Sequence, residues 1–298
     1  MPVWRWQLLR AGSFHLDGGA MFGILPKPLW ANMVTADLQN RVALQTNCLL
    51  LTNEDGRHVL VEAGYGNKFG PKEVDIYGLE TRWIADALAE VGVQREEIDA
   101  VVLTHLHFDH AGGITFVERE VQDGGAAAAA GPAASPPRPT FPNATIHVQK
   151  REWEDALANR STMTRTYLRE HLDPVAERVR TVDGEAEIMP GLRVRPVPGH
   201  TWGQQAILFD DEEGGLLFPG DVMPTINHAH PASSMAYDML PYENMRTKQA
   251  LFQECLRHER RWILDHEPGP PVVRIRQDGD RGDRVQLVPV SEAPPASG

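Results

Sequence analysis

Cysteine is scarce in this chain. Its 298 residues include only two, Cys48 and Cys255, which are far apart in the sequence. A disulfide framework or a zinc site built from thiolates needs several closely spaced cysteines, so the sequence excludes both. We expect the two thiols to be small core residues.

Long apolar runs and an excess of positive charge are also absent. No stretch approaches the roughly 20 apolar residues of a transmembrane helix, and the start, MPVWRWQLLR, has no secretory signal. We therefore expect a cytoplasmic protein with no membrane partner. The 41 acidic residues outnumber the 29 basic ones and give a formal net charge of −12. Such a charge repels a polyphosphate backbone, so nucleic acid is a poor partner.

Apolar residues recur in a regular pattern along the first part of the chain. Alternating apolar residues predict strands over residues 4–9 and 42–52, and a return strand over 58–61 predicts an antiparallel hairpin. A helical stripe starts at Trp83, and Gly92 is placed to end that helix in a left-handed conformation. The continuous apolar run that follows, at 100–103, predicts a strand buried on both faces.

The second part of the chain repeats the succession of strands and helices. Residues 145–148 predict a strand, and a helix is expected to start near Arg151. A late helix is predicted over 244–258, with Asn244 as its cap, followed by a strand over 262–264. This layout favours an α/β protein with a sheet core and helices outside.

Two segments are expected to lie outside this core. Residues 122–139, QDGGAAAAAGPAASPPRP, predict a flexible surface insertion, because glycine and proline closely flank the alanine run. Residues 291–298 are expected to form a disordered tail. We therefore predict a single domain over residues 1–290.

The segment THLHFDHAGG, residues 104–113, follows the buried strand and concentrates metal-binding side chains. In extended chain, alternate side chains point the same way, so His105 and His107 can reach one ion. If the chain turns into a helix at Asp109, that carboxylate and His110 can approach a second ion. The sequence therefore predicts a site for two metal ions.

Three later residues, His200, Asp221 and His266, each stand beside turn-forming residues at the end of a predicted strand. Together with the first segment they make five imidazoles and two carboxylates, a set that suits zinc better than calcium or magnesium. Two other histidines, His171 and His258, lie in predicted amphipathic helices, where we expect them to be exposed to solvent.

The order HxHxDH, then a histidine, an aspartate and a last histidine, resembles the metallo-β-lactamase superfamily of hydrolases over about residues 42–269. The resemblance implies a four-layered αβ/βα sandwich of two mixed sheets with helices outside. It implies a first metal site of His105, His107 and His200. It also implies a second site of Asp109, His110 and His266, with Asp221 bridging both.

Residues 17–30, 220–230 and 235–241 are similar to a bacterial branch that includes N-acyl-homoserine lactonases. The resemblance implies that a hydroxide held by two zinc ions opens a small ester or lactone, with iron or manganese as alternative metals. Asp109 is then the catalytic residue that relays a proton to the leaving oxygen. The branch also suggests a homodimer. The residues expected to contact the substrate are Phe22, His228, His230 and Tyr237.

Two positions depart from the family pattern. Glu62 stands where the family usually has an aspartate, and Pro224 stands where some lactonases have a tyrosine. Three alternatives to the lactonase hypothesis stay open. They are a phosphotriesterase or phosphodiesterase, an iron-dependent oxidoreductase such as a sulfur dioxygenase, and a non-catalytic binding protein on the same fold.

Overall fold

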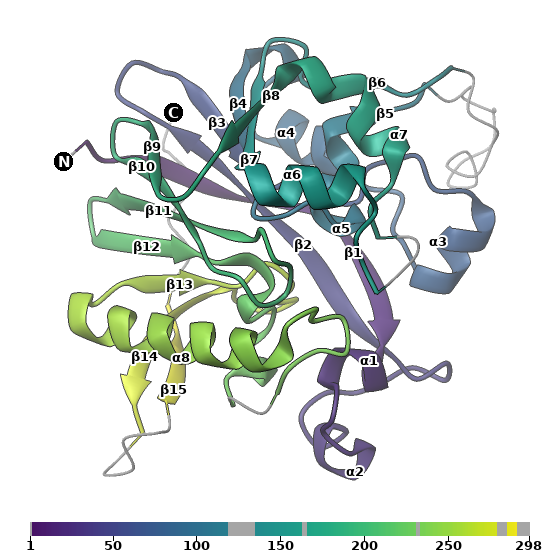
Figure 1. Ribbon diagram of the computed structural model, residues 1–298, viewed down its shortest axis with the longest axis vertical. Coiled ribbons are helices and arrows are strands. Elements are labelled where there is room, and N and C mark those ends of the chain that lie inside the picture. The colour runs from purple at the N-terminus through teal and green to yellow at the C-terminus, as the bar shows by residue number, and fades with distance from the viewer. Residues whose placement is uncertain (1, 119–134, 163–165, 231–232, 279–284, 291–298) are drawn as a thin grey trace.

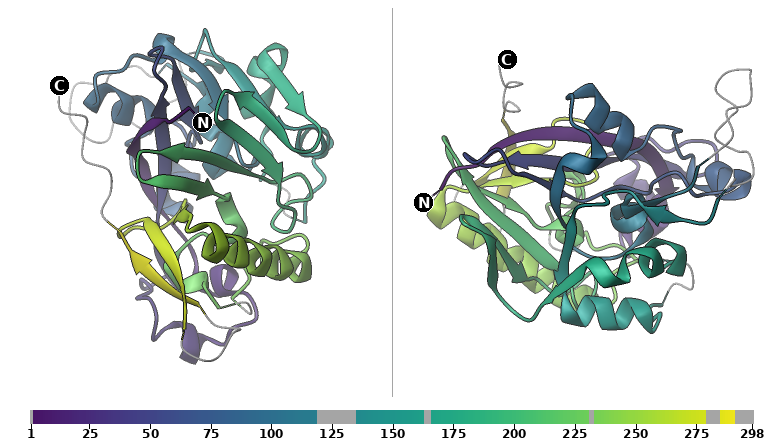
Figure 2. Two further views of the ribbon diagram at one scale, coloured as in Figure 1. Left: turned by 90° about the vertical axis from the view of Figure 1, so that its left-hand side faces the viewer. Right: turned by 90° about the horizontal axis from the view of Figure 1, so that it is seen from above.

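The structure is a computed structural model that describes residues 2–118, 135–162, 166–230, 233–278 and 285–290. Two β-sheets pack face to face, and helices cover the outer side of each sheet (Figures 1 and 2). The predicted αβ/βα sandwich is therefore confirmed. Most of the predicted insertion at 122–139 and the whole predicted tail at 291–298 lie outside the described residues.

The first sheet has six strands in the order β1-β2-β3-β4-β7-β8. Its first three strands pair antiparallel, and the pairs from β3 onward are parallel. The predicted hairpin is the pair β2 and β3. The strands are β1 (Arg5–Asp17), β2 (Arg41–Thr52), β3 (His58–Val61), β4 (Ile98–Val102), β7 (Thr145–Gln149) and β8 (Val179–Val182).

The second sheet has seven strands in the order β15-β14-β13-β12-β11-β10-β9. All neighbours pair antiparallel except β12 and β13, which are parallel. Both sheets are therefore mixed, as predicted. The strands are β9 (Ala186–Met189), β10 (Leu192–Pro196), β11 (Gln205–Asp211), β12 (Gly214–Phe218), β13 (Arg261–Ile263), β14 (Val272–Gln277) and β15 (Val285–Pro289).

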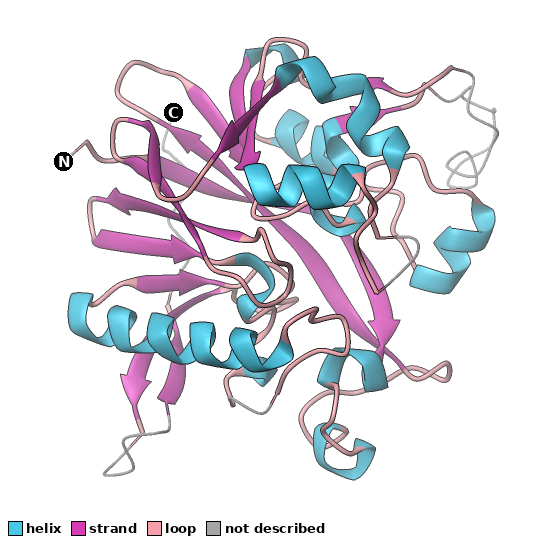
Figure 3. Cartoon of the chain, in the orientation of Figure 1, coloured by secondary structure: helices cyan, strands magenta, loops and turns pink. Residues whose placement is uncertain are grey.

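Helices α4, α6 and α8 lie on the outer sides of the sheets, whereas α1 and α2 lie beyond the end of β1 (Figures 1 and 3). Apolar side chains of α4 and α6 belong to the core outside the first sheet, and those of α8 belong to the core outside the second. The α-helices are α1 (Gly18–Phe22), α2 (Lys27–Trp30), α3 (Pro71–Tyr77), α4 (Ile84–Glu90), α5 (Phe108–Ala111), α6 (Lys150–Leu157), α7 (Arg169–Leu172) and α8 (Pro241–His258). Gly92 follows α4 with φ of 77°, as predicted.

Alternation along the strands explains how one sheet serves two cores. Leu49 and Leu51 of β2 face the second sheet, whereas Leu50 between them packs on the helix side. Val59 and Leu60 of β3 divide in the same way. Because successive side chains of a strand point to opposite faces, apolar residues on both faces bury the sheet completely. This rigid centre carries the loops of the candidate site.

Three expectations about local structure were wrong. Helix α8 begins at Pro241 rather than Asn244, because proline suits the first turn of a helix, and Asn244 lies buried inside it. His171 is buried rather than solvated. Arg138–Pro139, at the end of the predicted insertion, form strand β6 and pair with β5 (Thr115–Phe116).

In the described part of the chain, no helix combines the length and the apolar character needed to span a bilayer.

Candidate metal centre

Loops that follow four strands bring the predicted ligands to one edge of the sandwich. His105 and His107 follow β4, and the chain then turns into α5, which carries Asp109 and His110. The remaining ligands follow β10, β12 and β13 and are His200, Asp221 and His266. Strands β10, β12 and β13 run in one direction, so their carboxyl ends meet at the same edge.

Glycine permits the close approach of these loops. Gly220, next to Asp221, has φ of 59°, and a Cβ there would lie 2.6 Å from the Thr104 hydroxyl. A Cβ on Gly113, at the end of the THLHFDHAGG segment, would overlap the carbonyl oxygen of Ala63. Glycine is therefore needed at both positions.

The first group of potential ligands consists of His105, His107, His200 and Asp221. One nitrogen or oxygen atom from each residue lies within 4.8 Å of the others, and all four residues are buried. His200 Nε2 lies 3.0 Å from Asp221 Oδ2 and 2.9 Å from His107 Nδ1. The structure thus brings together the three imidazoles that the resemblance assigned to one ion.

The second group lies beside the first and shares Asp221 with it. It contains His110, Asp221, Asp265 and His266, again with ligand atoms within 4.8 Å of one another. His266 Nε2 lies 3.2 Å from Asp221 Oδ1, and His110 Nε2 lies 3.6 Å from Asp221 Oδ2. Asp221 therefore occupies the position between the groups that the resemblance implied.

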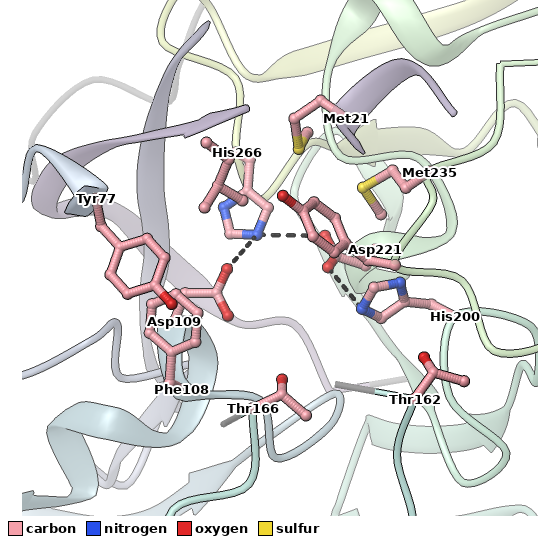
Figure 4. A pocket seen from close by; sticks show the side chains of 12 residues that line it. Met21, Tyr77, Phe108, Asp109, Thr162, Thr166, His200, Asp221, Met235 and His266 are labelled. Carbon is pink, nitrogen blue, oxygen red and sulfur yellow. Dashed lines mark ion pairs between the residues drawn. The ribbon is translucent and has the colours of Figure 1, made fainter. Parts of the chain in front are cut away.

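Two aspartates border the second group. Asp109 Oδ2 lies 3.6 Å from His266 Nε2, and its side chain faces the cavity (Figure 4). Asp265 is more deeply buried, and neither of its carboxylate oxygens has a hydrogen-bond partner. Asp265 was not among the ligands expected from the sequence, although its position next to His266 is a signal that could have found it.

Several buried atoms of the two groups have no hydrogen-bond partner. They include His105 Nε2, His107 Nε2 and Asp221 Oδ1. An unpartnered buried polar atom costs about 1–3 kcal/mol, so a concentration of them at one point indicates a missing partner. Clustered imidazole nitrogens and carboxylate oxygens are ligands that zinc and similar divalent ions prefer, so the residues present fit such ions.

Burial and neighbouring charges set the protonation of these groups. Burial lowers the pKa of His105 and His107 well below the usual range, and the adjacent imidazoles lower it further. Both rings are therefore neutral, which is the form that binds a metal. Although burial opposes ionisation, His200 and His266 hold the pKa of Asp221 well below its usual range, so it stays a carboxylate.

Three hydrogen bonds orient the imidazoles from behind. His110 Nδ1 donates to Glu62 Oε2 at 3.1 Å, and His266 Nδ1 donates to the Gln45 carbonyl at 3.0 Å. His200 Nδ1 donates to Asp238 Oδ1 at 2.9 Å. Each bond fixes the ring so that Nε2 faces the centre.

Glu62 reaches His110 although it is one methylene longer than the aspartate usual in the family. Its backbone has φ of 63°, which is uncommon for a residue with a side chain, and its second oxygen accepts the Thr104 N–H at 2.7 Å. The longer side chain is thus accommodated, and the hydrogen bond to the histidine is kept.

A cavity of about 370 Å³ lies over the two groups (Figure 4). His200, Asp221, His266 and Asp109 form its polar floor, and the other lining residues are mostly apolar or aromatic. They are Leu16, Met21, Tyr77, Phe108, Thr162, Thr166, Met235 and Tyr237.

Of the four predicted substrate contacts, Tyr237 alone is among the residues that line this cavity. Phe22 and His228 lie behind its wall, where their rings stack with centroids 4.9 Å apart. His228 Nε2 donates to the Met21 carbonyl at 2.9 Å, so it supports a lining residue without reaching the cavity. His230 is exposed and is not part of the lining.

A family model described as the metallo-beta-lactamase superfamily matches residues 41–254. The chain belongs to the metallo-β-lactamase superfamily of hydrolases. An N-acyl homoserine lactonase from Bacillus cereus is 26% identical to it over 223 residues, which are 71% of this chain and 74% of that protein.

Solved structures support the same fold. A probable metal-dependent hydrolase from Staphylococcus aureus is 26% identical and superposes with a TM-score of 0.81, covering 97% of this chain and 98% of that one. AidC, a dizinc quorum-quenching lactonase, shares 16% identity with a TM-score of 0.74, covering 98% of this chain and 96% of its own. At that identity, the second likeness concerns the fold alone.

Proposed function

We propose that the protein is a dinuclear zinc hydrolase that opens a small ester or lactone, with N-acyl-homoserine lactone as the favoured substrate. The observation that carries this proposal is the division of the cavity. Its floor holds imidazoles and carboxylates, whereas its walls include Met21, Phe108 and Met235. A substrate with a polar carbonyl head and an apolar chain matches both regions.

The ligands proposed for the two ions follow the geometry of the groups. His105, His107 and His200 would hold one ion, His110, His266 and Asp109 the other, and Asp221 both. Asp265 lies within reach of the second ion as a further carboxylate. Two divalent ions held by these residues would lower the pKa of water, which would supply a nucleophile at neutral pH, and would polarise the substrate carbonyl.

The side chains around the ions supply the remaining functions. The Asp109 carboxylate faces the cavity, where it is placed to accept the proton released by the attacking water and to pass that proton to the oxygen that leaves the carbonyl carbon. Pro224, which stands where some lactonases have a tyrosine, offers no hydroxyl. Tyr237 lines the same cavity, and its hydroxyl can donate a hydrogen bond to a substrate oxygen instead. Burial raises the pKa of Tyr237, so the phenol keeps its proton.

A substrate panel tests the proposed reaction. The zinc-loaded protein is assayed with an N-acyl-homoserine lactone, an aryl ester, a thioester and a phosphotriester, and each assay is repeated after treatment with a chelator. We expect the lactone to be the best substrate, and its hydrolysis to stop on chelation and return with zinc. Faster hydrolysis of the phosphotriester would overturn the lactonase proposal. Iron bound in the purified protein, with no hydrolysis of any panel member, would favour the oxidoreductase alternative.

The proposed substrate would make the protein a quorum-quenching enzyme, and we propose that it acts in the cytoplasm as a homodimer. Cys48 and Cys255 are both free and buried, which suits a reducing compartment.

The segment around α2 exposes several large apolar side chains that a second copy of the chain could cover. They are Ile24, Leu29, Met33 and Leu38. Light scattering at a mass of one chain would contradict the dimer, and cell fractionation tests the location.

A further inference from the structure

Glu152 of α6 is a carboxylate buried completely within the protein, with 0% of its surface exposed. Three groups donate hydrogen bonds to it. The Leu106 N–H and the Tyr167 hydroxyl reach Oε1 at 2.9 Å each, and the Thr201 hydroxyl reaches Oε2 at 2.6 Å. All three donors are neutral groups, and they come from three separate segments of the chain.

Two of these donors stand next to the first ligand group. Leu106 lies between His105 and His107, and Thr201 directly follows His200. The two segments are about a hundred residues apart in the sequence, yet the two oxygens of one carboxylate hold both. Glu152 therefore bridges the loop that carries His107 and the loop that carries His200.

The third donor connects the carboxylate to the cavity. The Tyr167 ring lies 5.1 Å from the His107 ring, measured between centroids, and the preceding residue, Thr166, lines the cavity. With its hydroxyl bound to Glu152, the Tyr167 ring is held beside the His107 imidazole, at an interplanar angle of 50°. The segment that includes Thr166 is therefore tied to the same carboxylate.

The backbone of Glu152 is in close contact with the turn that follows His200. A Cβ on Gly203 would overlap the Glu152 backbone nitrogen, so the turn after His200 packs directly on the start of α6. Burying a carboxylate that accepts hydrogen bonds only from neutral groups costs free energy of folding. Apolar side chains could hold the two loops together at a lower cost. A cationic centre next to these loops offsets that cost, because it attracts the negative charge.

We propose that Glu152 is a positioning residue of the first ligand group, which places His107 and His200 for one divalent ion and adds negative charge behind them. The inference rests on the proposed metal centre and does not depend on the identity of the substrate. It differs from the direct hydrogen bonds of Glu62 and Asp238 because Glu152 acts through Leu106 and Thr201 and touches no imidazole nitrogen.

Zinc binding is the measurement that tests this role. Glu152→Gln keeps the shape and removes the charge, and Thr201→Val removes one donor at nearly constant volume. Each purified protein is freed of metal and titrated with zinc in competition with a chromophoric chelator. We expect the native chain to bind two ions. Glu152→Gln should bind one of them about 10-fold to 100-fold more weakly. Thr201→Val should also lower the affinity for that same ion.

Asp155 provides the matched control. It lies one turn further along α6, is also 0% exposed, and pairs with Arg151 and Arg160 instead of the ligand loops. Asp155→Asn should lower the melting temperature and leave both zinc affinities unchanged. The absorption spectrum of the cobalt-substituted protein should change in Glu152→Gln and stay native in Asp155→Asn, because it reports ligand geometry.

Unchanged zinc affinities in both Glu152→Gln and Thr201→Val would overturn the inference, as would equal losses in Asp155→Asn. If Glu152→Gln does not fold, Thr201→Val and Tyr167→Phe decide the outcome, since each removes a single hydrogen bond. A native chain that binds no zinc would instead refute the proposed metal centre. The two failures are therefore distinguishable.

Discussion

His200 and Asp238 are joined by a buried hydrogen bond of 2.9 Å between Nδ1 and Oδ1. The other oxygen of Asp238 accepts the Met235 N–H at 3.1 Å and the Asn244 side-chain amide at 2.9 Å. Met235 lines the cavity, so one carboxylate connects a candidate metal ligand to the wall above it.

Asp238→Asn should weaken this connection. An amide has one acceptor oxygen, so its NH₂ group must face either the His200 donor or the two other donors. We expect zinc affinity to fall about 10-fold to 100-fold, measured by titration of the metal-free protein. The exposed Glu212→Gln serves as a control for loss of one negative charge. Native zinc affinity in Asp238→Asn would show that the carboxylate does not orient His200.

Asp221→Ala should affect both ligand groups, because both contain this residue. We expect fewer than two metal ions per chain by elemental analysis, together with loss of hydrolysis. His107→Ala should have the same two consequences through the first group. The control is His258→Ala, an exposed histidine on α8, which should keep both ions and full activity. Substantial turnover by Asp221→Ala would contradict the proposed centre.

The buried His228 should make stability depend on pH. Burial and the nearby Lys248 lower the pKa of His228 to about 4, from about 6.5 in the unfolded chain. Between these values the unfolded chain binds a proton that the folded chain does not, so the free energy of unfolding falls as pH falls.

His228→Gln should not show this fall in the free energy of unfolding at low pH. Relative to the variant, the native chain should lose about 3 kcal/mol of unfolding free energy between pH 7 and pH 4, at about 1.4 kcal/mol for each pKa unit. Urea denaturation of both proteins across that range measures the difference. A constant difference from pH 7 to pH 4 would show that His228 keeps an ordinary pKa in the folded protein.

Met235→Trp should reduce the space available for the apolar part of a substrate. The larger side chain enters the cavity. The backbone N–H at this position, which donates to Asp238, is unchanged by the substitution. We expect kcat/KM for a decanoyl lactone to fall about tenfold or more, and that for a butanoyl lactone to change by less than about threefold. Met235→Leu keeps a similar volume and is the control. Equal losses for both lactones would place the acyl chain elsewhere.

Most of the candidate ligands that the structure brings together can be picked out from the sequence, because imidazoles and carboxylates are concentrated at the ends of predicted strands. His105 and His107 share one side of an extended segment, and each later ligand stands beside turn residues, which local spacing can reveal. The apolar patterns indicated only a sheet core with helices outside, and the four-layered sandwich came from the resemblance to the superfamily. In the structure, Leu49, Leu50 and Leu51 show how one strand serves both cores.

Residues that act across long sequence separations could not be predicted in this way. Asp238 is 38 residues from the histidine it orients, and Glu152 is 46 and 49 residues from two of its donors. Asp238 lies in the segment 235–241 that resembles the lactonase branch, but nothing in that segment points to His200, and Glu152 stands in no such segment. The partners of both carboxylates are determined by packing and not by spacing. Asn244 illustrates the converse, since a residue suited to capping a helix is buried inside one, where its amide binds Asp238.

Because Asp221 belongs to both ligand groups, the two ion sites of the proposed centre would not fill independently. Asp221 Oδ2 lies 3.0 Å from His200 Nε2, and Oδ1 lies 3.2 Å from His266 Nε2. A cation held by one group would therefore withdraw electron density from a carboxylate that the other group also needs. Thermodynamic linkage then makes the influence reciprocal: whatever factor the first ion imposes on the affinity for the second, the second imposes on the first. Metal supply would therefore act on this protein through a coupled equilibrium rather than through two separate ones.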